Sequence, residues 1–125
     1  MRQRITCTQT IQVGSALQRS VSTVLEVDAY DVIEVSILDG ASDEEVEVQP
    51  GSDVRLLMIV SDAYDAALTY KVNAIANDAH ALDQPQVFAG TGAMGLLDAA
   101  APGALFFSNA SGQDVLINIV VGRNV

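Results

Sequence analysis

The chain has 125 residues and a formal net charge of −10, from 16 acidic and 6 basic residues. This length suits one domain. The charge argues against nucleic acid as a partner, because phosphate contacts need clustered Lys or Arg, and it argues equally against an anionic membrane surface. Half of the residues are apolar and none is Trp. We therefore expect a core of Val, Ile, Leu and Ala, in which the β-branched types favour sheet.

The N-terminal part alternates apolar and polar residues. Residues 4–13 and 17–27 each place their apolar side chains mainly on odd positions, and Gly14-Ser15 separates the two stretches. A period of two is typical of a half-buried strand. The two stretches therefore predict a hairpin.

The rest of the chain reads as further strands with polar turns between them. Residues 75–103 are the exception: they are rich in Ala, Gly and Asp, with at most one short strand near Val87-Phe88, and no segment holds a helical period. We expect an all-β fold, an antiparallel β-sandwich that is jelly-roll-like, as one domain over residues 1–125 with one long Ala/Gly-rich loop. The further strands are expected at residues 32–38, 46–48, 54–60, 68–74, 104–109 and 114–121.

Residues that carry chemistry are few. His80 is the one histidine and lies near Asp78 and Asp83, whereas a jelly-roll metalloenzyme usually needs two or three His ligands. Cys7 is the one cysteine, so an intrachain disulfide is excluded, and its place in an alternating stretch favours a buried small side chain. We predict that the protein is not an enzyme and has no catalytic residues, no cofactor and no transition-metal site.

The stretch from Asp39 to Glu47 gathers several carboxylates, which are ligands that suit calcium. Their spacing does not match the EF-hand loop. Calcium binding there stays open as an alternative.

Large apolar side chains also occur in the Gly-rich stretch of residues 86–107. Such side chains either fold onto the core of their own domain or contact a neighbouring subunit. The candidate interface residues are Phe88, Met94, Leu96 and Leu97.

Three parts of the chain, taken in order, resemble a known family. They are Ile5-Thr-Cys-Thr-Gln-Thr10, then residues 55–62 followed by 67–73, and finally residues 105–112 followed by 115–121. This order resembles that of small virion proteins of tailed bacteriophages, which open on a Thr-rich strand and close on an apolar hairpin with Thr/Ser-Asn. The acidic insert at residues 41–47 and the loop at 86–103 depart from that pattern.

The resemblance implies a decoration or cement protein of the capsid. Its partners would be the major capsid protein or another virion protein and further copies of itself, as a dimer or trimer, with no nucleic acid and no membrane. It would be made in the host cytoplasm and reside on the capsid surface of the virion. The alternative is a β-sandwich module of a phage tail or fibre that binds a glycan or calcium.

Overall fold

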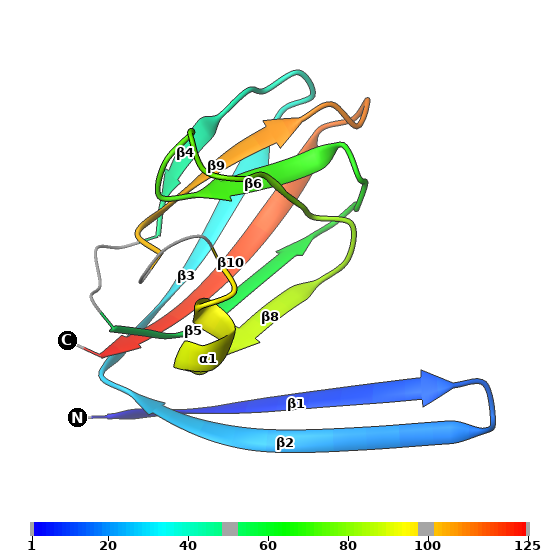
Figure 1. Cartoon of the computed structure of the whole chain (residues 1–125), viewed down its shortest axis with the longest axis vertical. Coiled ribbons are helices and arrows are strands. Elements are labelled where there is room, and N and C mark those ends of the chain that lie inside the picture. Colours follow the sequence, from blue (N-terminus) through cyan, green and yellow to red (C-terminus); the bar gives the residue numbers. More distant parts are fainter. Residues whose placement is uncertain (1, 49–52, 98–101, 125) are drawn as a thin grey trace.

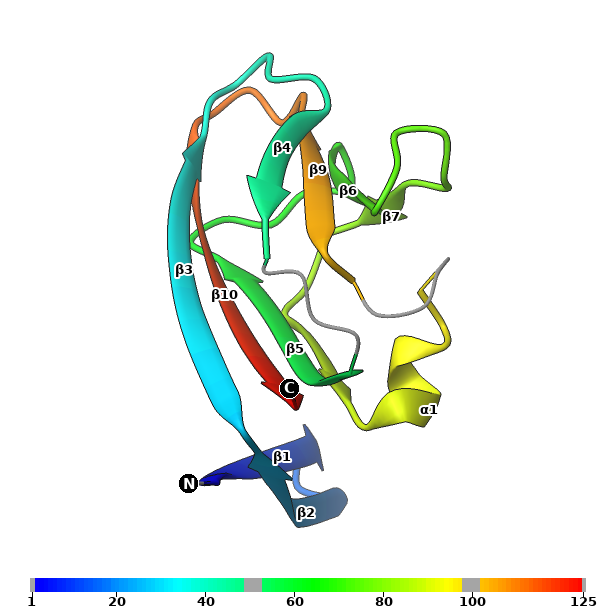
Figure 2. The same cartoon turned by 90° about the vertical axis from the view of Figure 1, so that its left-hand side faces the viewer.

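Two antiparallel sheets of four strands each face one another, and a long hairpin lies outside both (Figure 1). The computed structural model describes residues 2–48, 53–97 and 102–124. The expectation of an all-β protein built from antiparallel sheets is confirmed. Figure 2 shows the two sheets edge-on, with the hairpin below one end of the sandwich.

The first sheet, here called the β3 sheet, has the strand order β3-β10-β5-β8. The second sheet, here called the β4 sheet, has the order β4-β9-β6-β7. The strands of the β3 sheet are β3 (Ala29–Ile37), β10 (Val115–Asn124), β5 (Asp53–Ser61) and β8 (Gln86–Ala89). Those of the β4 sheet are β4 (Glu44–Glu47), β9 (Ala104–Asn109), β6 (Leu68–Val72) and β7 (His80–Ala81).

The core lies between the two sheets and is filled by alternate residues of the facing strands. In β10, Val115, Ile117, Ile119 and Val121 are all buried. The expected aliphatic core is complemented by aromatic rings on the other sheet, since Tyr70 and Phe107 are fully buried with centroids 6.0 Å apart.

The hairpin pairs β1 (Gln3–Val13) with β2 (Leu17–Val27) over their full length, from Gln3↔Val27 to Val13↔Leu17. We call it the arm. Neither strand joins one of the two sheets. The expectation that these strands are half-buried parts of a sandwich is therefore wrong for most of the arm, because every residue from Thr8 to Val24 is exposed. The alternation identified the two faces of the ribbon correctly, but nothing in this chain covers the distal apolar face.

The stretch expected to be irregular contains β7, β8 and one turn of helix, α1 (Thr91–Met94). The helix follows Gly90, whose φ of 87° lies in the left-handed region that glycine adopts at low cost. No helical period marks this helix in the sequence, because four residues are too few to establish one. Residues 98–101 of the expected loop lie outside the described residues.

Candidate functional site: the arm and the sheet face beside it

The two faces of the arm differ in chemistry. One face is polar: Thr8 and Ser22 are joined across the strands by a hydroxyl hydrogen bond of 3.2 Å, and Thr10 and Ser20 by one of 3.1 Å. The opposite face carries the odd-numbered residues, since the register pairs odd positions with odd positions. The arm is therefore an amphipathic two-stranded ribbon.

The apolar face of the arm is open to solvent in its distal half. The exposed fractions are 64% for Ile11, 62% for Val21, 55% for Val13 and 39% for Leu17. An isolated two-stranded hairpin is at best marginally stable in water, and long strands with unpaired edges are otherwise prone to unwanted pairing. The distal half of the arm is therefore an exposed apolar ribbon that no other described part of this chain covers.

The root of the arm, in contrast, is fixed to the sandwich. A Cβ at Gly122 would lie 2.9 Å from Ile5 Cδ1 and 3.3 Å from Val27 Cγ1, so glycine permits a close approach of the arm to β10. Arg2 Nε also lies 3.4 Å from Oδ1 of Asp28, the residue between β2 and β3. The direction in which the arm leaves the sandwich is thus set by packing.

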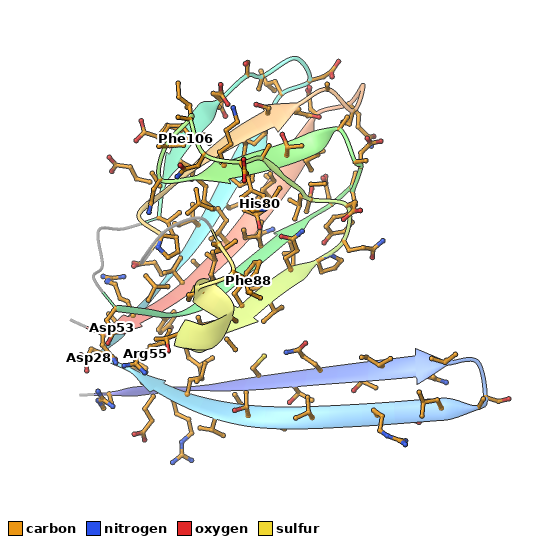
Figure 3. All side chains as sticks on the ribbon, viewed as in Figure 1. Asp28, Asp53, Arg55, His80, Phe88 and Phe106 are labelled. Atoms are coloured by element: carbon orange, nitrogen blue, oxygen red, sulfur yellow. The ribbon has the colours of Figure 1, made fainter. Side chains whose placement is uncertain are left out.

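Figure 3 shows Asp28, Asp53 and Arg55 close to this root. Arg55 Nε donates a 2.8 Å hydrogen bond to Asp53 Oδ1, which holds the pKa of that carboxyl below its usual range and raises the pKa of Arg55. The same aspartate accepts a hydrogen bond from the Asn124 side chain. These contacts tie the start of β5 to the end of β10, and their role is structural.

The β3 sheet presents an apolar outer face. Val120 pairs with Val32 on one side and with Met58 on the other, and Met58 pairs with Val87. Because Ile119 and Val121 point into the core, Val120 and its row point away from it. We call these four residues, Val32, Val120, Met58 and Val87, the apolar row.

Two hollows lie between the arm and this outer face. The first is lined on the arm side by residues 5–9 and on the sheet side by Leu56, Met58, Val87 and Val120. The second is bounded by residues 3–5, Tyr30, Val32 and Val120. Tyr30 and Val32 remain 54% and 63% exposed, so the β3 end of the apolar row is largely uncovered.

Charge is distributed unevenly between arm and sandwich. Residues 1–27 hold Arg2, Arg4 and Arg19, three of the 6 basic residues, but only Glu26 of the 16 acidic ones. They carry a net charge of +2, and residues 28–125 carry −12. Two of these basic residues, Arg4 and Arg19, lie in the arm itself, which carries a net charge of +1 over residues 3–27.

Three of the four candidate interface residues contribute to the chain's own core. Met94 and Leu97 are 5% and 3% exposed, and Phe88 packs partly buried against the core. Leu96, at 77% exposure, faces solvent. The segment around α1 packs its other large apolar side chains against the core. Of the four candidates, Leu96 is therefore the residue whose side chain a partner could contact.

The residues considered for metal or catalytic chemistry have structural surroundings. The ring of His80 is half-buried with its centroid 5.4 Å from that of Tyr70, and Cys7 is half-buried at the first hollow. Asp39 accepts a hydrogen bond from the backbone of Gly112, and Asp43 pairs with Lys71 at 3.2 Å. Within the described ranges, no three His, Cys, Asp or Glu side chains come together in a way that suits a metal ion.

Burial raises the pKa of the Tyr70 hydroxyl above its usual value. The hydroxyl donates a 2.5 Å hydrogen bond to Gln86 Oε1, and the Gln86 amide in turn donates to the carbonyl of Ala81. A neutral phenol held in this way links the β4 sheet to the edge of the β3 sheet and is placed to hold the two together.

No helix in the described part of the chain is long and apolar enough to cross a membrane. No protein-family model matches the chain, and neither a curated protein nor a solved structure does. Function is therefore inferred here from the site itself. Sequence reasoning placed the interface in the Gly-rich stretch and missed the arm, because the alternation of residues 4–13 and 17–27 indicated half-buried strands.

Proposed function

We propose that this protein is a non-enzymatic structural subunit of a bacteriophage virion, a decoration or cement protein that binds the lattice of the major capsid protein as a homo-oligomer. The observation that carries the proposal is the arm. From Thr8 to Val24 it is wholly exposed, it is apolar on one face, and it is anchored rigidly at its root. A projecting ribbon on a stiff sandwich suits a protein that acts by contact with neighbouring subunits.

A jelly-roll fold is part of the proposal. The sandwich has eight strands, β3 to β10 in chain order. The first of them, β3, lies beside the last, β10, and the second, β4, lies beside the seventh, β9. Two four-stranded sheets related in this way are typical of jelly rolls, which are common in capsid proteins. The strand order supports the proposed location on the capsid surface, after synthesis in the host cytoplasm.

Repeated weak contacts fit this role better than a deep ligand site. A symmetric oligomer multiplies each contact, so a modest apolar surface suffices for firm attachment to a shell. We place Leu96 against the shell, because it is a large apolar side chain that is exposed in the segment just after α1.

The test is to add the purified protein to phage shells that lack it and to measure co-sedimentation and shell melting. We expect saturable binding at a fixed ratio to capsid subunits and a higher melting temperature of the shells. Leu96→Asp should weaken binding about tenfold or more, since a leucine buried in an interface contributes about 1.5–3 kcal/mol.

Leu38→Asp is the matched control, because Leu38 is likewise an exposed leucine, at 57%, but follows β3 instead of α1. It should bind as the unaltered chain does. Failure of the unaltered protein to bind such shells would refute the proposed function.

A further inference from the structure

We propose that the distal arm of one copy of this chain lies on the apolar row of the β3 sheet in a second copy, with Arg19 of the arm meeting Glu34 of that sheet. The inference goes beyond the proposed function: it concerns contact between copies, and it holds or fails whether or not the copies bind a capsid. Four observations carry it.

The first observation is reach. Residues 5–9 of the arm already lie beside the row of their own sheet, across the first hollow. Beyond them the arm extends past the edge of its own sandwich (Figure 1). At about 3.3 Å per residue, the stretch from Gln9 to Val13 adds about 13 Å to the arm. Its exposed apolar side chains therefore lie beyond the sheet from which the arm starts.

The second observation is the vacant end of the row. The arm root covers the row toward β5 and β8, whereas Val32 and the neighbouring Tyr30 stay more than half exposed beside the second hollow. Every copy thus carries both an uncovered apolar ribbon and, at Val32 and Tyr30, an uncovered apolar part of the sheet face. Apolar surfaces of this kind are more stable when they cover one another.

The third observation is charge. The arm, residues 3–27, carries a net charge of +1 and is attracted to a sandwich that carries −12, whereas two such sandwiches repel each other, so contact between copies is most favourable where the arm of one meets the sandwich of the other. The chain itself therefore supplies a surface of the sign that its arm requires. This complementarity selects a second copy as the occupant.

The fourth observation is a matched pair of single charges. Arg19 is opposite Ile11 on the odd-numbered, apolar face of the arm. Glu34 is exposed on the outer face of β3, two residues beyond Val32 and opposite Asn118 of β10. Neither forms an ion pair with another residue in the described part of the chain. Among the described residues, the Arg19 guanidinium donates only to the carbonyl of Gln18, so docking of the apolar surfaces brings a cation without a carboxylate partner onto a face that carries Glu34.

Sedimentation velocity of the full chain over a concentration series tests the inference through a charge exchange. The unaltered protein should self-associate. Arg19→Glu and Glu34→Arg should each raise the dissociation constant about tenfold or more, because each sets like charges against one another. The double variant R19E/E34R restores opposite charges and should bring the constant back to within about threefold of the original.

Gln18→Glu is the matched control, because it adds a negative charge next to Arg19 but on the polar face of the arm, opposite Gln12. It should leave association unchanged. Arg19 and Glu34 are exposed, so the variants should fold, and circular dichroism verifies this. A monomeric unaltered protein at every concentration, single reversals without effect, or a double variant no better than the singles would each overturn the proposal.

Discussion

Asn109 is the buried polar side chain of the core, with 1% of its surface exposed. Its amide nitrogen donates to the carbonyls of Ile37 (3.2 Å) and Gln113 (2.8 Å), and its Oδ1 accepts from the backbone N–H and the hydroxyl of Ser111. One side chain thereby closes the turn between β9 and β10 and ties it to the end of β3. The sequence predicts a turn at this position, but the contact with Ile37, 72 residues away, depends on the tertiary fold.

Replacing Asn109 by Ala should lower the free energy of unfolding by about 2–4 kcal/mol, because the buried carbonyl of Ile37 and the part-buried groups of the turn lose their hydrogen bonds together. Urea unfolding measures the change. Ser111→Ala is the control: it removes one hydroxyl at the surface side of the same turn and should cost about 1 kcal/mol or less. Equal losses in the two variants would show that Asn109 does not link β3 to the turn.

At the scale of elements, the strands with a clear period of two were predictable from sequence. The arm was expected as 4–13 paired with 17–27, and β10 as 114–121, each within a few residues of the strand found. The short elements β7 and α1 were not predictable, because two to four residues are too few to show a period. Such elements form through contacts with the rest of the sandwich. The arm's place outside the sandwich was also beyond reach, because alternation identifies an apolar face but not what covers it.

A shortened arm separates the fold from its contacts. The variant lacks residues 10–13 and 17–20 and keeps the turn at residues 14–16. The turn then joins Gln9 to Val21, which already pair across the strands. Both residues are odd-numbered, as are Val13 and Leu17 at the original turn, so each side chain stays on its own face of the arm. We expect the melting temperature to stay within about 2 °C, since all the removed residues are exposed, and self-association to be lost.

Thermal unfolding and sedimentation on the same samples check both expectations. A large drop in melting temperature would show that the distal arm stabilises its own sandwich. Retained association would place the contact between copies elsewhere on the surface.

At the scale of the whole molecule, the chain divides into a stiff, acidic sandwich and a weakly basic ribbon. The sandwich encloses one continuous core, within which Tyr70, Phe107 and Asn109 are almost wholly shielded from solvent. The ribbon has unpaired edges and an apolar face that its own sandwich leaves uncovered. The contact between copies that we propose therefore lies in a different part of the chain from the core that stabilises the fold.

Amide hydrogen exchange at concentrations well below and well above the dissociation constant tests most directly whether the arm is the contact between copies. We expect the amides of residues 8–24 and of residues 30–34 to gain protection together as the concentration rises, and R19E to move both gains to concentrations about tenfold higher or more, because arm and sheet face would then cover each other less. Exchange in these two segments that is the same at every concentration, or protection that rises in one segment without the other, would contradict the account.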